Sequence, residues 1–217
     1  MKLGAIFDMD GTLFDTEKFY AQAWLDVAEE FGEKPDPNVA TAVSGTNLDG
    51  YTRRVIKKFY PNIDVEKYIA RVLEIARTVP EKNLELMPGV EEILTFFKSN
   101  GVRMAVASSA PVEVIEKNLT RSNLHEYFDV LVGGNMVANG KPAPDIFLLA
   151  AKNLHLLPED CYIFEDSLNG IRAAAASNGV AIMIPDQVQP TDDIKKICAA
   201  VFASLTVAKQ AIERGEI

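Results

Sequence analysis

The most constraining feature of this sequence is a repeated alternation between short apolar runs and helical patterns. Five runs rich in β-branched side chains are typical of buried strands: Leu3–Phe7, Arg103–Ala107, Val130–Val132, Cys161–Phe164 and Val180–Ile184. Between them, apolar side chains recur at helical spacing, as from Val90 to Phe97, where the pattern stops at Gly101. Strands that alternate with helices form a parallel sheet with helices on both faces. The sequence therefore predicts an α/β fold with a Rossmann-like, doubly wound parallel sheet.

One long segment interrupts this alternation. From Thr16 to about Asn83 we predict no strand, and three amphipathic helical patterns follow one another, the third of them capped by Asp64. Because the segment leaves directly after the first strand, we expect it over the carboxyl end of the sheet, where open parallel sheets bind ligands. We expect residues 1–15 and 84–217 to form an α/β catalytic core domain, and residues 16–83 to form an inserted all-α helical cap domain.

Charge and the length of the apolar stretches limit the partners. The net charge is −9 and the pI is near 4.8, so the average surface repels nucleic acid and anionic lipid. The longest uncharged run, residues 173–185, is shorter than the ~20 apolar residues of a spanning helix. The apolar stretch at residues 3–7 is too short for a secretion signal. We expect a cytoplasmic protein without nucleic-acid or membrane partners, monomeric or, alternatively, a weak dimer.

Two aspartates follow the first predicted strand. Asp8 and Asp10 stand where the strand opens into a loop, and a turn at Gly11 can bring both carboxylates toward one point. Two carboxylates at one site can share a cation, and a hard divalent ion such as Mg²⁺ favours oxygen ligands. The alternative is an ordinary Asp-Gly turn beside a solvated acid.

Further polar residues follow three other predicted strands. Ser108 and Ser109 precede a helix start, whose backbone amides suit an anion, although an ordinary N-cap is the alternative. Lys141 lies in a stretch stiffened by two prolines, with a surface lysine as the alternative. Glu165 and Asp166 end the fourth strand, and capping of the next helix explains only one of them.

Together, these segments resemble the haloacid dehalogenase-like superfamily, most closely its phosphatase and β-phosphoglucomutase-like branch. The resemblance covers essentially the whole chain, including the helical cap. It implies that Asp8 is the nucleophile and Asp10 the general acid and base. It also implies that Ser108, Ser109 and Lys141 bind phosphate and that Asp8, Asp10, Glu165 and Asp166 form a Mg²⁺ site.

The resemblance predicts a Mg²⁺-dependent phosphatase that acts on a small phosphorylated metabolite, a sugar or polyol phosphate, through an aspartyl-phosphate. Phosphoryl transfer needs its negative charge neutralised and its nucleophile placed in line. Attack by Asp8 would divide one difficult displacement into two easier ones. Asp10 must be protonated when the alcohol leaves and ionised when water attacks.

Two alternatives are a β-phosphoglucomutase-like sugar phosphomutase and a non-catalytic module that binds a phosphorylated metabolite. In the related mutases, basic residues stand where this chain has Tyr20, Leu48 and Ala76, which favours hydrolysis. A silent module would have been indicated by loss of Asp8 or Asp10, and both are present.

Substrate specificity is expected to come from the cap. The candidates are Tyr20, Gly45, Thr46, Asn47, Arg53 and Arg77. Each of them also has an ordinary alternative role in cap packing or as a solvated charge.

Overall fold

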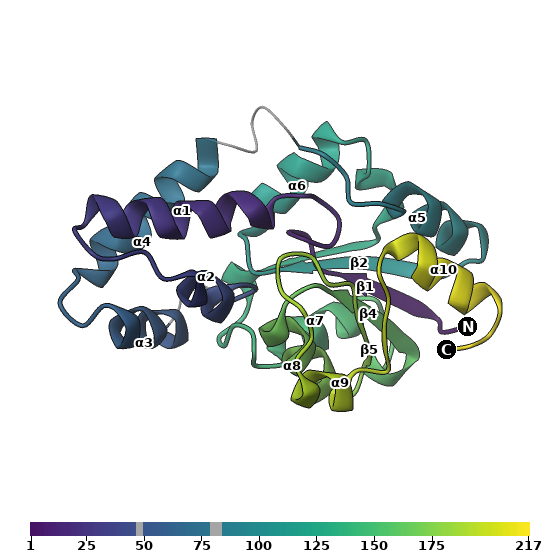
Figure 1. Ribbon diagram of the computed structural model, residues 1–217. Helices are drawn as coiled ribbons and strands as arrows, with labels where there is room; N and C mark the ends of the chain where they lie inside the picture. Colours follow the sequence, from purple (N-terminus) through teal and green to yellow (C-terminus); the bar gives the residue numbers. More distant parts are fainter. Residues whose placement is uncertain (47–49, 79–83) are drawn as a thin grey trace.

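A parallel sheet of six strands forms the centre of the computed structural model, which describes residues 1–46, 50–78 and 84–217, apart from the side chains of residues 76–78 (Figure 1). The strand order is β3-β2-β1-β4-β5-β6. The strands are β1 (Gly4–Phe7), β2 (Arg103–Ser108), β3 (Val130–Gly133), β4 (Cys161–Glu165), β5 (Val180–Met183) and β6 (Ala200–Val201). This order places β1 between β2 and β4, where the winding direction of the sheet reverses. The predicted α/β class and the doubly wound parallel sheet are confirmed.

Helices cover both faces of this sheet. They are α5 (Val90–Ser99), α6 (Val112–Arg121), α7 (Asp145–Asn153), α8 (Leu168–Ala176), α9 (Asp192–Ile197) and α10 (Leu205–Glu213). Three short 3₁₀ turns lie at His125–Tyr127, Gly134–Met136 and Pro158–Asp160. Successive strand residues point to opposite faces, so Phe7 packs with α5, α6 and α10, whereas Ile6 packs with α7, α8 and α9.

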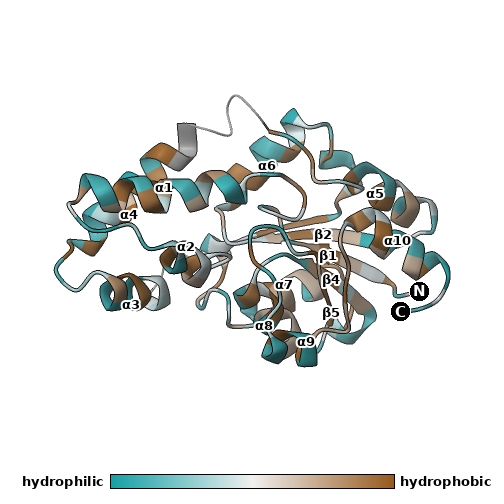
Figure 2. Ribbon diagram, in the orientation of Figure 1, coloured by the Kyte–Doolittle hydropathy of each residue, from teal (hydrophilic) through white to brown (hydrophobic). Residues whose placement is uncertain are grey.

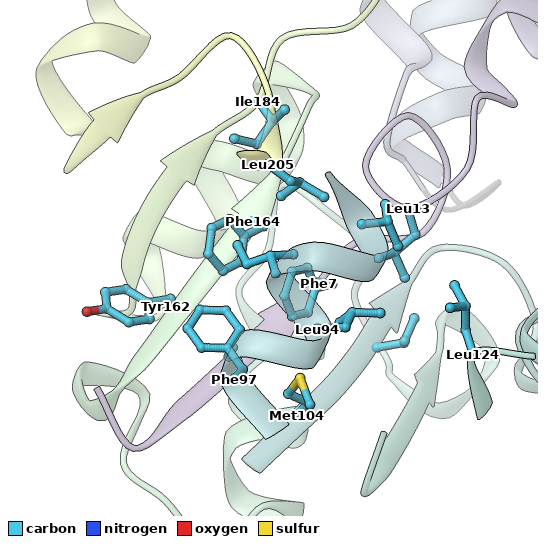
Figure 3. Packing of buried hydrophobic residues seen from close by; sticks show 14 of the residues in the cluster. Phe7, Leu13, Leu94, Phe97, Met104, Leu124, Tyr162, Phe164, Ile184 and Leu205 are labelled. Atoms are coloured by element: carbon cyan, nitrogen blue, oxygen red, sulfur yellow. The ribbon is translucent and has the colours of Figure 1, made fainter. Parts of the chain in front are cut away.

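The first of these two cores combines aromatic side chains, such as Phe7, Phe97 and Phe164, with aliphatic ones (Figure 3). The Phe7 and Phe164 rings are stacked with centroids 4.7 Å apart, and Phe97 of α5 lies against both. Because both faces of the strands are buried, β1 is apolar and β4 is apolar up to its last residue, Glu165; much of the ribbon at the centre of the sheet is brown, that is hydrophobic, in Figure 2. Within the described residues, no helix is both long and apolar enough to cross a membrane.

Of the described helices that lie between β1 and β2, the first four form a helical cap beyond the carboxyl ends of the strands (Figure 1). They are α1 (Glu17–Glu30), α2 (Pro37–Val43), α3 (Gly50–Phe59) and α4 (Val65–Thr78). The cap has its own apolar core, in which the Tyr68 hydroxyl donates to the Trp24 carbonyl at 2.6 Å. As predicted, Asp64 caps α4, since its Oδ1 accepts from the Lys67 amide.

Helix α2 and strand β6 are among the elements that sequence reasoning missed. The prediction of three cap helices was wrong because α2, only seven residues long, shows too short a periodic pattern. Its start signal is nevertheless present, since Asp36 accepts from the Asn38 amide at 2.9 Å and Pro37 is the first helical residue. Strand β6 has two residues and therefore no recognisable apolar run.

The two connections between cap and core run side by side. Phe14 and Leu86 form an antiparallel bridge, the Asp15 amide donates to the Glu85 carbonyl at 3.0 Å, and the Met87 amide donates to the Leu13 carbonyl at 2.9 Å. The cap is thus joined to the sheet by a narrow pair of hydrogen-bonded segments, close to the end of β1.

Candidate active site

Three buried charged side chains meet at the carboxyl ends of β1 and β4. Asp8 follows β1, Glu165 ends β4, and Lys141 lies between them. The Lys141 Nζ donates to Asp8 Oδ1 at 2.6 Å, to Glu165 Oε1 at 2.5 Å and to the Ala107 carbonyl at 3.2 Å. Lys141 is fully buried, so the surface-lysine alternative is excluded.

Burial and charge act against each other in this group. Burial raises the pKa of Asp8 to about 7; Lys141 opposes this increase, whereas the negative charges of Glu165 and Asp10 add to it. Burial alone would lower the pKa of Lys141, but Asp8 and Glu165 more than compensate, and the net effect is a raised pKa. The surroundings therefore favour the charged form of Lys141 beside Asp8.

The Glu165 carboxylate is held on both of its oxygens. Oε1 accepts from Lys141, and Oε2 accepts from the Ser167 amide at 3.0 Å and hydroxyl at 2.9 Å. A Cβ on Gly170 would come within 1.9 Å of the Glu165 carboxyl carbon, so only glycine fits there. The α8 cap is Ser167, which accepts from the Gly170 amide, so helix capping explains neither Glu165 nor Asp166.

A group of carboxylates suited to a metal ion lies at this point. Asp8, Glu165 and Asp166 are all buried, and one oxygen of each lies within 4.8 Å of the others. Among the described residues, no group donates a hydrogen bond to the Asp166 carboxylate. Burial raises its pKa well above the usual value, and the charge of Glu165 adds to this effect. A buried carboxylate without a protein donor, in an all-oxygen set, fits a hard divalent cation.

Asp10 lies beside this group and is not one of its members. The chain turns at Gly11, whose φ is +78°, and the Thr16 hydroxyl donates to Asp10 Oδ1 at 2.5 Å. Burial raises the pKa of Asp10, while the Thr16 hydrogen bond and Lys141 lower it by less. As the sequence predicted, the turn brings Asp8 and Asp10 to one cavity.

Ser108 and Ser109 also reach this cavity from the end of β2. Ser108 is buried, and its Oγ accepts from the Ala110 amide at 3.1 Å. The Ser109 hydroxyl donates to the Gly45 carbonyl of the cap at 2.8 Å. At the start of α6, the Val112 amide donates to Asn135 Oδ1 at 3.1 Å, so this amide already has a protein acceptor.

The cavity has a volume of about 450 Å³ and lies between cap and core. Its described lining is Asp8, Asp10, Glu17, Tyr20, Trp24, Val43, Ser44, Gly45, Thr46, Val72, Leu73, Ser108, Ser109, Ala110, Pro111, Val114, Gly134, Asn135, Val137 and Ala138.

Three of the six cap candidates, Tyr20, Gly45 and Thr46, line this cavity. Arg53 is not among the described lining residues and forms an exposed ion pair with Glu66 at 2.6 Å. Asn47 and the side chain of Arg77 lie outside the described residues, as do Leu48 and the side chain of Ala76.

Two polar side chains at the cap–core contact were missed by sequence reasoning. Glu17 lines the cavity and accepts from the Ser44 hydroxyl at 3.0 Å; burial raises its pKa to about 8, and the charge of Asp10 adds to the increase. Asn169 donates to the Ala42 and Ser44 carbonyls at 3.2 and 3.1 Å. The position of Glu17 directly after the Asp8–Thr16 segment was the available signal, whereas nothing in the sequence indicates the Asn169 contacts.

Comparison with known proteins identifies a family and several relatives of this chain. Residues 5–184 match the model of the family described as haloacid dehalogenase-like hydrolase. A phosphorylated carbohydrates phosphatase from Thermotoga maritima is 37% identical over 79% of this chain and 80% of its own. Hexitol phosphatase B from Escherichia coli is 31% identical over 94% of this chain and 93% of its own. A solved Thermotoga maritima structure, named as a proposed β-phosphoglucomutase, is 30% identical, covers 99% of both chains and has a TM-score of 0.72.

Proposed function

Because the chain belongs to the haloacid dehalogenase-like hydrolase family and is an enzyme of that family, we propose that it is a Mg²⁺-dependent phosphatase of small sugar or polyol phosphates. The observation that carries this proposal is the buried Asp8–Lys141–Glu165 arrangement beside Asp166, at the end of a cavity between cap and core. We assign the chemistry to residues 1–15 and 84–217 and recognition of the leaving group to residues 16–83.

In the first half of the reaction, a carboxylate oxygen of Asp8 attacks phosphorus. A bond forms between this oxygen and phosphorus, and the bond from phosphorus to the alcohol oxygen breaks, which leaves an aspartyl-phosphate. Asp10 donates a proton to the departing oxygen, and burial favours the protonated form that this step requires. The positive charge of Lys141 beside Asp8 and the Ser108 hydroxyl in the cavity would stabilise the negative phosphoryl oxygens.

In the second half, water attacks phosphorus and Asp10 accepts its proton, so that phosphate leaves and Asp8 is restored. The Mg²⁺ ion, when bound, neutralises the charge on the transferring group. Asp8 and Asp166 would hold it, because both oxygens of Glu165 already accept hydrogen bonds, from Lys141 and Ser167, whereas only one oxygen of Asp8 does. Glu165 instead fixes Lys141 at the edge of this site.

The substrate class is supported by the relatives and by the cavity. Two relatives are named as a phosphorylated carbohydrates phosphatase and a hexitol phosphatase. A cavity of about 450 Å³ accommodates a small leaving group. The test is to incubate the purified protein with Mg²⁺ and a panel of phosphate monoesters; release of inorganic phosphate from sugar or polyol phosphates supports the proposal, and no release from any of them overturns it.

A sugar phosphomutase is the second candidate, because one relative of known structure carries that proposed name. Both reactions share the aspartyl-phosphate and differ in whether water or a sugar accepts the phosphoryl group. Tyr20, which stands where the related mutases have a basic residue, lines the cavity. Fewer cap cations favour hydrolysis, since a mutase must hold a second phosphate.

We expect removal of divalent metal to abolish activity and added Mg²⁺ to restore it. In Asp166→Ala, the Mg²⁺ concentration for half-maximal activity should rise by more than ~10-fold. Mutation of a residue that only contacts a metal ligand already lowers metal affinity by ~10–100-fold, and Asp166 is assigned as a ligand itself. Ser108→Ala should lower kcat without changing the Mg²⁺ requirement. Both effects are measured by titrating the initial rate with Mg²⁺. If Ser108→Ala raises the Mg²⁺ requirement and Asp166→Ala does not, the roles of these two residues are exchanged.

A further inference from the structure

Glu17 lies in the cavity that the leaving group would occupy, and the reaction steps above give it no role. It is the first residue of α1 and directly follows Thr16, whose hydroxyl donates to Asp10. A Cβ on Gly11 would come within 3.0 Å of Glu17 Cγ, so this side chain packs against the turn that carries Asp10. Glu17 is outside the carboxylate group suited to the metal ion.

The protein only partly satisfies the hydrogen-bonding capacity of the Glu17 carboxyl group. Among the described residues, the Ser44 hydroxyl is its one donor, through Oε1. Ser44 is itself fixed, because Asn169 binds its carbonyl and Ser109 binds the carbonyl of Gly45. The carboxyl group is therefore held in place from the cap side, and Oε2 is left for a group inside the cavity.

The charge of the cavity restricts what that group can be. None of the described residues that line it is a lysine, arginine or histidine, whereas Asp8, Asp10 and Glu17 all contribute carboxyl groups. A leaving group with a second phosphate would bring negative charge toward Glu17 without a compensating cation in this lining. A neutral hydroxyl group can instead hydrogen-bond to the carboxyl group without that penalty.

We propose that Glu17 binds a hydroxyl group of a neutral, polyhydroxylated leaving group and selects against leaving groups that carry a second phosphate. This inference rests on the proposed phosphatase function. Glu17 is then a specificity-determining residue, which acts on the alcohol part of the substrate and leaves the phosphoryl chemistry to Asp8 and Asp10.

The test compares three substrates: fructose 1-phosphate, fructose 1,6-bisphosphate and p-nitrophenyl phosphate, whose leaving group has no sugar hydroxyl. Glu17→Met keeps the side-chain volume but removes its hydrogen-bonding atoms. It should lower kcat/KM for fructose 1-phosphate by ~10–100-fold, the usual effect of leaving a buried polar contact unmade. Its kcat/KM for p-nitrophenyl phosphate should stay within about twofold of wild type. Its preference for fructose 1-phosphate over the bisphosphate should fall.

Glu17→Gln should retain part of the selectivity, and the exposed Glu29→Gln on the same helix serves as the matched control. An equal loss on fructose 1-phosphate and p-nitrophenyl phosphate, or no change on either, would overturn the role of Glu17. If a thermal melt shows that Glu17→Met is not folded, the test uses Glu17→Gln instead, with the same comparison of kcat/KM among the three substrates. Absence of phosphate release from all three substrates by the wild-type protein would instead overturn the phosphatase function itself.

Discussion

Asp8→Asn is expected to lower kcat by more than ~10³-fold, because the amide has nearly the shape of the carboxylate but cannot attack phosphorus. The fold should persist: Lys141 keeps its ion pair with Glu165 and its bond to the Ala107 carbonyl. Loss of the Asp8 charge also removes a repulsion toward the substrate phosphate, so the ester should bind at least as tightly as to wild type.

The measurements are kcat from phosphate release, thermal melting, and the dissociation constant of a sugar phosphate for the inactive variant. Asp26→Asn, an exposed change on α1, is the control and should behave as wild type. If Asp8→Asn keeps most of its Mg²⁺-dependent activity with an unchanged fold, Asp8 is not the nucleophile.

Lys141→Met is expected to cause the second largest loss, and to affect both stability and activity. The change leaves the Asp8 and Glu165 carboxylates buried together without the cation that both contact. Removing one partner of a buried ion pair typically costs ~3–5 kcal/mol. The loss of a positive charge beside the transferring group should lower kcat by ~10²–10³-fold.

A second variant separates these two effects. Lys141→Met combined with Glu165→Gln removes one of the two uncompensated charges, so we expect it to recover part of the lost stability and none of the lost activity. Denaturant unfolding without added metal gives the free energy of unfolding, and phosphate release with Mg²⁺ gives kcat. Recovery of activity together with stability would mean that Lys141 serves only the fold.

The central sheet and the residues at its edge could be predicted because both depend on short-range sequence features. Strands buried on both faces are continuous apolar runs, as in Gly4–Phe7 and Cys161–Phe164. The carboxyl ends of parallel strands meet at one edge, so polar residues after two strands become neighbours in space. For this reason, Asp8 and Glu165 were expected to lie close together although 157 positions separate them in the sequence. In the structure both carboxylates accept a hydrogen bond from Lys141.

The contacts between cap and core could not be predicted in this way, because no periodic pattern encodes how one unit docks on another. Asn169 reaches the carbonyl of Ala42 across 127 positions, and this contact becomes visible only once both units are folded. The same limit applies to charged cap residues: Arg53 was a specificity candidate, yet it lies in an ion pair with Glu66. Glu17 was overlooked because an acid in the first turn of a helix is common for reasons of the helix dipole.

The acceptor of the phosphoryl group tests the central claim most directly. The protein is incubated with Mg²⁺, β-glucose 1-phosphate and a catalytic amount of glucose 1,6-bisphosphate, and the products are followed by phosphorus NMR. We predict stoichiometric release of inorganic phosphate and no stimulation by the bisphosphate, because water discharges the aspartyl-phosphate and the described cavity lining offers no cation for a second phosphate. Rapid accumulation of glucose 6-phosphate with little free phosphate would contradict the phosphatase and identify a mutase.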